Sequence, residues 1–143
     1  MKKIGTIIVM LTLLSLSLHA NATIITDQNQ AANTVHMANF NQLDLAQSFQ
    51  QTNDNIAGAG IFLQAGQGSS DTVTISLWDA LPNQTGTMPA NGSGVGTQGS
   101  WCDEFWNPVS VVPDTELLLV FISSANTLCI AGLTSNPVYH GQV

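Results

Sequence analysis

The clearest pattern in the chain is an alternation of apolar and polar positions over residues 71–79. Val73, Ile75 and Leu77 fall on one face of an extended segment. The opposite face carries Thr72, Thr74, Ser76 and Trp78. A period of two residues is typical of a β-strand with one buried face. The pattern therefore predicts a strand over these residues.

A second segment, residues 117–122, is apolar at every position. It is short, and it is preceded by the turn-forming pair Pro113-Asp114. Short, continuously apolar segments are typical of strands that are buried on both faces. We therefore expect a central strand here, covered on both sides.

Strand and turn signals alternate through the rest of the chain. Further predicted strands cover residues 45–50, 56–64, 95–97, 101–112 and 127–131. Turn-forming residues occupy 66–70, 81–86, 91–94, 113–114 and 135–137. After residue 22 no segment keeps a helical period for three turns, although residues 36–45 could form a short helical turn. Seven or eight short strands in one domain predict an all-β fold, an antiparallel β-sandwich.

The first 22 residues have the order of a secretory signal peptide. Lys2 and Lys3 precede an apolar run over residues 4–18, and Ala20-Asn21-Ala22 follows. As a helix the run would be roughly 22 Å long, shorter than the ~30 Å hydrocarbon core of a bilayer. We expect cleavage after Ala22, a secreted or periplasmic domain over residues 23–143, and no stable membrane span. A membrane anchor is the lesser alternative.

Charge narrows the classes of partner. The chain is 44% hydrophobic and only 8% charged, against a usual charged share of about 25%. Lys2 and Lys3 are the only Lys or Arg residues, so the segment after residue 22 has nine acids and neither of these basic residues. Without a cationic surface it cannot displace counterions from phosphates, which excludes nucleic-acid binding.

Several short blocks in the second half carry a resemblance to a known group. They are Leu45–Phe49, Val73–Asp79 with Leu81-Pro-Asn83, Trp101–Trp106, Pro108–Pro113 with Leu119-Val-Phe121, and Ile130-Ala-Gly132 with Ser135-Asn-Pro137. In this order they resemble secreted bacterial jelly-roll domains with a galactose-binding-like β-sandwich, which often precede a PEP-CTERM sorting segment. The resemblance covers residues 45–143 and implies a jelly-roll fold in an extracellular setting. It implies no defined activity.

The chain departs from that group in three places. Pro113-Asp114 stands where the group has Pro-Gly, and Leu117 and Leu118 replace a pair of aromatic residues. The chain stops at Val143, where the similar domains continue into a closing strand and a sorting tail. We therefore expect a shortened sandwich that lacks its closing C-terminal strand. The exposed edge would favour self-association.

Cys102 and Cys129 are the only cysteines. An exported chain permits a disulfide, which would stabilise the fold by roughly 3–4 kcal/mol. The alternative is two separate buried thiols, because a disulfide requires a Cα separation of about 4.4–6.8 Å that sequence does not guarantee.

Four aromatic residues are candidates for stacking against sugar rings: Trp78, Trp101, Trp106 and Tyr139. Trp78 is the best of them, because it lies on the polar face of its strand. It is followed by a loop that contains Asp79 and Asn83, whose side chains can bind hydroxyl groups. The alternative is a packing role, which we favour for all four. For Trp101 and Trp106, where we favour it most, it means filling the sandwich core or covering a sheet edge.

Three acidic or amide-rich runs offer oxygen ligands for a structural calcium ion. They are Asp27–Gln30, Asn53–Asn55 and Asp103-Glu104. None of them matches the EF-hand pattern, and solvated loops are the favoured alternative. No cofactor is required.

No catalytic constellation is present in the sequence. Gly94–Gly99 matches G-x-G-x-x-G, but a strand-like acidic run follows it where a helix is needed, so a glycine-rich hairpin connection is expected. There is no G-x-S-x-G motif, and after residue 22 the only histidines are His36 and His140. Asp103 and Glu104 are adjacent on a predicted strand and would point to opposite faces.

The sequence thus favours a secreted, non-catalytic β-sandwich module that binds carbohydrate or envelope polysaccharide. Its expected contact residues are Trp78, Asp79, Asn83 and Tyr139. The first alternative is a structural or matrix protein that associates through strand edges. A glycosidase-like enzyme is the last alternative.

Overall fold

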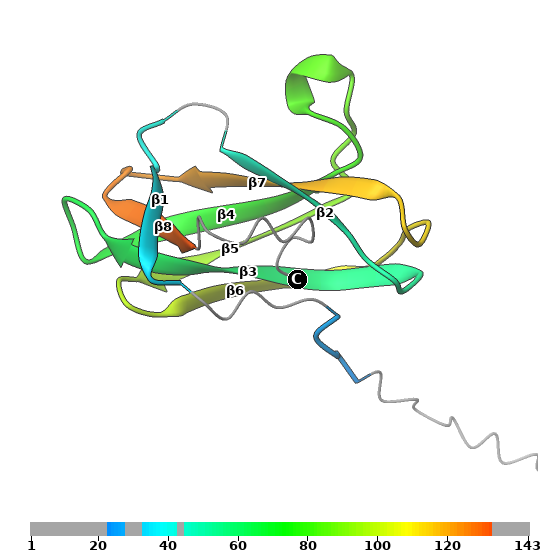
Figure 1. The fold of residues 1–143 in the computed structure, drawn as a ribbon, viewed down its shortest axis with the longest axis horizontal. Coiled ribbons are helices and arrows are strands. Elements are labelled where there is room, and N and C mark those ends of the chain that lie inside the picture. The colour runs from blue at the N-terminus through cyan, green and yellow to red at the C-terminus, as the bar shows by residue number, and fades with distance from the viewer. Residues whose placement is uncertain (1–22, 28–32, 43–44, 133–143) are drawn as a thin grey trace, which may run out of the picture.

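Eight antiparallel strands and one short 3-10 helix make up the computed structural model, which describes residues 23–27, 33–42 and 45–132 (Figure 1). The elements are β1 (Val35–Asn39), β2 (Ala46–Gln50), β3 (Asn55–Ala65), β4 (Ser70–Trp78), η1 (Pro82–Gln84), β5 (Ala90–Thr97), β6 (Trp101–Ser110), β7 (Glu116–Ser123) and β8 (Leu128–Gly132). The all-β prediction is therefore confirmed for this part of the chain. The predicted signal peptide lies outside the described residues.

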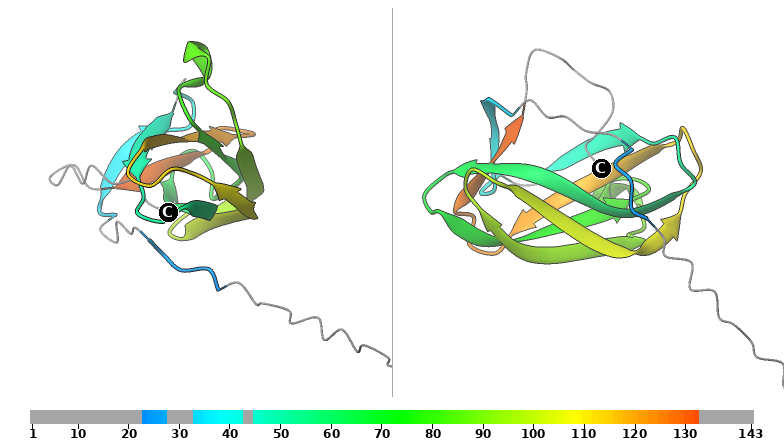
Figure 2. Two further views of the ribbon diagram at one scale, coloured as in Figure 1. Left: turned by 90° about the vertical axis from the view of Figure 1, so that its right-hand side faces the viewer. Right: turned by 90° about the horizontal axis from the view of Figure 1, so that it is seen from below.

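The strands form two four-stranded sheets that face each other as two layers (Figure 2). One sheet has the order β1-β8-β3-β6, and the other has the order β2-β7-β4-β5. Only β4 and β5 are consecutive strands within one sheet, so every other connection crosses between the layers. The result is a β-sandwich-like fold whose core lies between the sheets.

The predicted alternation in β4 is confirmed. Val73, Ile75 and Leu77 are fully buried, and Phe49 of β2 and Leu63 of β3 belong to the same core. Burying each of these side chains stabilises the fold by about 1.5–3 kcal/mol. This burial holds the layers together in a region that contains no Lys or Arg for ion pairs.

The prediction for β7 is confirmed in one respect and wrong in another. The strand is central, because it lies between β2 and β4. However, only its inward face is covered in the described structure: Leu119 is buried, whereas Ile122 on the outward face is 58% exposed. The apolar outward face was mistaken for a buried one because composition alone does not show how many layers cover a sheet.

Two segments fold as strands where other structures were expected. Residues 36–39 lie in β1, which pairs with β8, so the predicted helical turn is wrong there. Residues 91–94 lie in β5 and do not form a turn. A Cβ at Gly92 would lie 2.8 Å from Glu104 Cβ, so glycine in β5 allows β6 to approach closely.

The G-x-G-x-x-G segment ends β5 and leads into β6 through residues 98–100. No helix follows it, as expected. The two strands belong to different sheets, so the connection is not the hairpin that was predicted.

A buried carboxylate fixes the turn between β7 and β8. Asp71 on β4 accepts hydrogen bonds from the hydroxyls of Ser123 and Ser124 and from the backbone N–H groups of Ala125 and Thr127, with distances of 2.6 Å for Ser124 and 3.2 Å for Thr127. Burial alone would raise the pKa of Asp71, but these hydrogen bonds outweigh it and hold the pKa far below its usual value. The charge of the Asp71 carboxylate is thus stabilised by several hydrogen-bond donors and needs no Lys or Arg partner.

Candidate functional site

The residues predicted to contact a ligand are only partly brought together. Trp78 ends β4 and is half-buried, and its indole Nε1 is buried without a hydrogen-bond partner in the described structure. Asn83 is exposed on η1, in the green loop that stands away from both sheets in Figure 1. Tyr139 lies outside the described residues.

Asp79 closes the base of the projecting loop. Its carboxylate accepts hydrogen bonds from the backbone N–H and the hydroxyl of Thr87, at 2.6 and 2.5 Å. The side-chain hydrogen bond from Thr87, followed by the backbone one, lowers the pKa of Asp79. The structure thus gives Asp79 a clamping role within the loop.

Trp101 and Trp106 have different environments, although both were expected to pack in the core. The expectation is confirmed for Trp106, which packs against the core and donates its Nε1–H to the carbonyl of Ile56 at 3.2 Å. The core role is wrong for Trp101, which lies on the edge strand β6, is 36% exposed and meets Phe62 edge-on at a centroid distance of 5.8 Å. The two residues are five positions apart on one strand, so they point to opposite faces.

Trp101 begins a row of exposed side chains on the outward face of β6. Asp103 and Phe105 follow it at intervals of two residues, and Phe105 is 60% exposed. Side chains two positions apart on a strand share a face and are separated by about 6.6 Å. The face therefore presents two aromatic rings with a carboxylate between them.

Glycines on the neighbouring strand leave space beside this row. In the β3–β6 ladder Gly58 lies opposite Phe105, and Gly60 lies opposite Asp103. A Cβ at Gly58 would lie 2.7 Å from Phe105 Cδ1. Because neither glycine has a side chain, the Phe105 ring and the Asp103 carboxylate lie over the glycine positions, and these four residues line a hollow in the surface.

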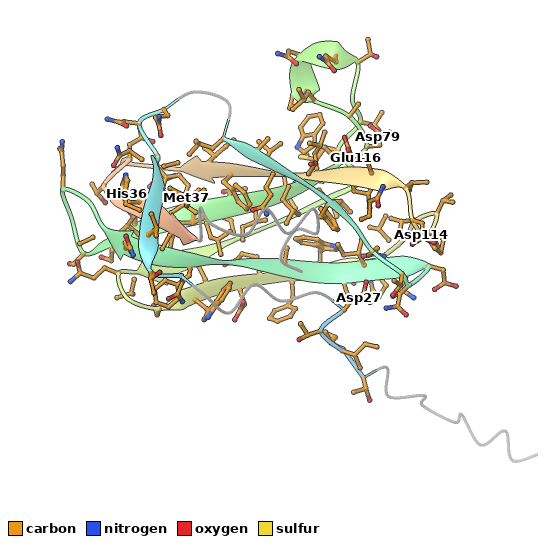
Figure 3. The ribbon with its side chains drawn as sticks, in the orientation of Figure 1. Asp27, His36, Met37, Asp79, Asp114 and Glu116 are labelled. Carbon is orange, nitrogen blue, oxygen red and sulfur yellow. The ribbon has the colours of Figure 1, made fainter. Side chains whose placement is uncertain are left out.

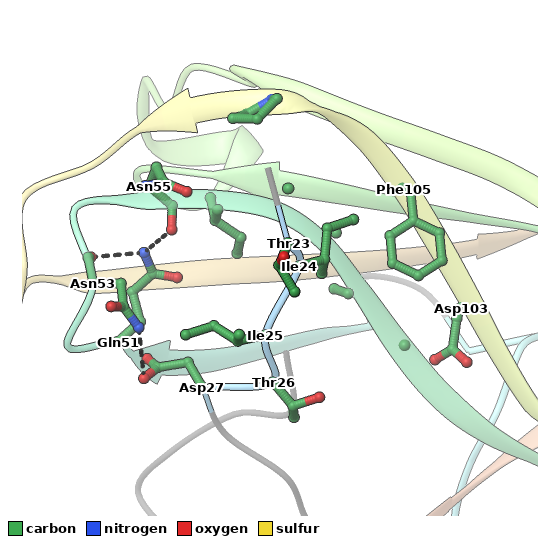
Figure 4. A pocket seen from close by; sticks show the side chains of 16 residues that line it. Thr23, Ile24, Ile25, Thr26, Asp27, Gln51, Asn53, Asn55, Asp103 and Phe105 are labelled. Atoms are coloured by element: carbon green, nitrogen blue, oxygen red, sulfur yellow. Dashed lines mark hydrogen bonds between the residues drawn. The ribbon is translucent and has the colours of Figure 1, made fainter. Parts of the chain in front are cut away.

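This hollow is part of a groove of about 390 Å³ (Figure 4). One side is formed by β3 and β6, including Asp103 and Phe105. The other side is formed by the N-terminal segment Thr23–Asp27, in which Ile24 and Ile25 are 61% and 67% exposed. The groove thus combines apolar surface with carboxylates and amides.

Asp27 attaches the N-terminal segment to the turn before β3. Its carboxylate accepts hydrogen bonds from Thr52 N at 2.9 Å, Thr52 Oγ1 at 2.7 Å and Asn53 Nδ2 at 2.9 Å. The buried Gln51 holds the same turn by donating to the carbonyls of Asn53 and Asn55, at 2.9 and 2.8 Å. The wall of the groove is therefore fixed by several hydrogen bonds.

Two of the runs considered as calcium ligands meet in this region. Asp27 and Asn53 are in direct contact, but the contact is between a carboxylate and a donor amide. Asp103 and Glu104 point to opposite faces, since Glu104 lies against Gly92 of β5. Among the described residues no group of three or more His, Cys, Asp or Glu could hold a metal ion.

Asp103 differs in its environment from three aspartates that hold turns or segments in place. Asp27, Asp71 and Asp79 each accept at least two hydrogen bonds that fix a turn or segment. No described residue donates a hydrogen bond to the Asp103 carboxylate, which lies exposed on β6. It is therefore available to a ligand.

Cys102 and Cys129 are both free and buried. They lie on β6 and β8, which flank β3 on opposite sides. Two strand spacings amount to about 9.6 Å, beyond the ~7 Å limit for a disulfide. The structure therefore matches the second alternative, two separate thiols.

The described residues include no helix that is long and apolar enough to cross a bilayer. No protein-family model matches the chain, and the searches of curated proteins and of solved structures gave no match.

The groove was missed in the sequence, although two signals for it are present. Trp101, Asp103 and Phe105 occupy alternate positions, which places them on one face. Gly58 and Gly60 alternate in the same way on another predicted strand. What sequence does not show is the register that sets these two rows side by side.

Proposed function

We propose that the chain is a secreted, non-catalytic module that binds carbohydrate through the outward face of β3 and β6. One observation carries the proposal: exposed Trp101 and Phe105 flank Asp103, whose carboxylate accepts no hydrogen bond from the described residues, beside the glycine positions of β3. The site therefore lies on the opposite layer from Trp78 and Asn83. Figure 3 shows the two regions apart, with Asp79 at the projecting loop and Asp27 at the groove.

The chemistry of these side chains supports a sugar ligand. Large aromatic side chains are usually buried, and exposed ones grouped on a rigid surface mark interaction sites. An aromatic face covers the C–H face of a sugar ring, while carboxylate and amide groups bind its hydroxyls. Because the side chains stand on paired strands, the site is formed before the ligand binds.

The fold and the location fit this proposal. The strand orders 1-8-3-6 and 2-7-4-5, with eight antiparallel strands in two sheets, support a jelly-roll topology. The Lys2-Lys3 pair followed by an apolar run supports export. An extracellular carbohydrate-binding module is consistent with both.

Pull-down on insoluble polysaccharides and affinity electrophoresis in soluble ones test the proposal with residues 23–143. We expect Trp101→Ala and Phe105→Ala each to weaken binding about tenfold or more, because each removes a stacking surface. Ile122→Ala, an exposed apolar residue on the other sheet, is the matched control and should bind as the wild type does. Loss of binding in Trp78→Ala, with Trp101→Ala unaffected, would instead place the site at the projecting loop.

Association through strand edges is the second candidate function. β5 is an eight-residue edge strand without a charged residue, and its Val95 is 76% exposed. Long uncharged edges are prone to pair with other chains. Sedimentation velocity over a wide concentration range tests this function: assembly that Val95→Lys abolishes would support it, and a monomer at all concentrations would exclude it.

A further inference from the structure

From the charges around the groove, we infer that its ligand is a glycan with protonated amino groups, such as a polymer of glucosamine that is largely free of N-acetyl groups. This inference rests on the proposed carbohydrate-binding function and specifies the class of sugar. It is carried by the position of the Asp103 carboxylate between two aromatic rings and by the absence of Lys and Arg from the described residues.

Asp103 supplies the specific contact. Its carboxylate has no donor among the described residues, and opposite it on β3 stands Gly60, which has no side chain. An ammonium group could therefore reach the carboxylate without displacing an existing hydrogen bond. Hydrogen bonds between charged groups are about twice as strong as those between neutral groups.

The aromatic rings favour the same ligand. Phe105 and Trp101 lie two residues to either side of Asp103, each about 6.6 Å away along the strand. Aromatic faces attract cations within about 6 Å of the ring centre. An amino sugar that stacks on either ring would thus place its ammonium group near both a ring and the carboxylate.

The wider charge pattern excludes the opposite class of glycan. The described residues contain eight acids and no Lys or Arg, and both sides of the groove carry a carboxylate, Asp103 on one side and Asp27 on the other. Polysaccharides with uronate or sulfate groups would meet these carboxylates and no Lys or Arg side chain, and would be repelled. Neutral sugars could stack on the rings, but they would gain nothing from the charge of Asp103.

The inference is tested by isothermal titration calorimetry with three hexasaccharides: glucosamine, N-acetylglucosamine and galacturonate. The protein is residues 23–143, at low ionic strength and at a pH where the sugar amine is protonated. We expect the glucosamine hexamer to bind at least about tenfold more tightly than the N-acetylated one, since one charge-assisted contact distinguishes them. Galacturonate should not bind, and added salt should reduce the preference.

Two variants with the same change of charge make the test specific. Asp103→Asn should abolish the preference for glucosamine while keeping binding to the N-acetylated hexamer. Glu116→Gln removes one charge from an exposed site on the other sheet and should keep the preference.

Three results would overturn the inference. Equal affinity of the wild type for both amino-sugar hexamers would remove the proposed role of Asp103 but leave carbohydrate binding intact. Failure of the wild type to bind any of these sugars or the polysaccharides above would remove the proposed function as well.

The third result concerns a rival cation beside the groove, the α-ammonium group that cleavage creates at Thr23. If the Asp103→Asn substitution lowers the pKa of that α-amino group, and the wild type binds no sugar, then the N-terminal ammonium group is the cation that pairs with Asp103 in the groove.

Discussion

Asp103 lies directly opposite Gly60 in the β3–β6 ladder, and a Cβ at residue 60 would overlap the carboxylate. The Asp103 side chain therefore occupies space that depends on the absence of a side chain across the strand. This relationship links a backbone feature of β3 to the chemistry of the groove. It also means that the groove can be altered by a substitution on β3, with Asp103 itself left in the sequence.

We predict that Gly60→Ala weakens glycan binding several-fold with little loss of stability. The new methyl group displaces the carboxylate, which is the end of a flexible side chain and can move. Gly58→Ala is the contrasting variant, because its Cβ would lie 2.6 Å from the backbone oxygen of Glu104. That change should lower the free energy of unfolding by about 1–3 kcal/mol, as overpacking does. Calorimetry and urea unfolding measure both quantities, and unchanged binding in Gly60→Ala would contradict the prediction.

We predict that Asp71→Asn destabilises the fold by about 2–4 kcal/mol. The carboxylate accepts several hydrogen bonds from the β7–β8 turn, and an amide nitrogen would face donors such as the Ser124 hydroxyl. Asp79→Asn is the control, because Asp79 clamps an exposed loop and its loss should cost much less. Urea denaturation followed by tryptophan fluorescence measures the difference. Equal effects of the two variants would contradict it.

The lowered pKa of Asp71 predicts that the free energy of unfolding depends on pH. The folded-state pKa of Asp71 is lowered from 3.8, so its contribution to stability is complete above about pH 5 and is lost as the pH falls through and below 4. Protonating the other acids relieves repulsion and acts in the opposite direction. The difference in unfolding free energy between wild type and Asp71→Asn isolates the effect. It should shrink on acidification, and a difference that stays constant from pH 6 to 2 would contradict the prediction.

We predict that Asp27→Asn loosens one wall of the groove. The change weakens the hydrogen bonds from Thr52 and Asn53 that hold the N-terminal segment. Proteolysis within residues 23–27 should become faster and glycan binding weaker, while the melting temperature changes little because the core is not involved. Asp54→Asn is the matched control, since Asp54 receives only a local hydrogen bond from Asn55. Equal rates of proteolysis in the Asp27→Asn and Asp54→Asn variants would contradict the role of Asp27 in holding this wall of the groove.

We predict that both thiols stay free in the purified protein and react slowly until it unfolds. Cys102 and Cys129 are buried. Burial, followed by the nearby charge of Glu104, raises the pKa of Cys102 to about 11, and burial also raises the pKa of Cys129. Since the thiolate is the reactive form, alkylation should be slow in buffer and complete in denaturant. An intact mass that increases on reduction would show a disulfide instead.

The strongest periodic segments were predicted correctly because their own side chains decide their structure. The alternation of Val73, Ile75 and Leu77 already specifies which face of β4 is buried. β1 was not predicted, since its strand structure depends on pairing with the distant β8. Of β5 only residues 95–97 were predicted, because the glycine-rich residues 91–94 have the composition of a turn. Pairing between remote segments leaves little trace in a single sequence.

The site was predicted less well than the fold for the same reason. Trp101 was assigned to the core because large aromatic residues usually pack there. Its exposure follows from the register in which Phe62 lies opposite Trp101 and Gly60 opposite Asp103. Alternation gives the face of each residue, but only the pairing shows which residues share a surface.

The most direct test of the site is an NMR titration of ¹⁵N-labelled residues 23–143 with the glucosamine hexamer. We predict that the largest amide shifts map to the groove: Gly58, Gly60, Asp103 and Phe105, together with the Trp101 indole N–H. Shifts confined to Trp78 and the projecting loop, or to the edge strand β5, would contradict a carbohydrate site on the outward face of β3 and β6.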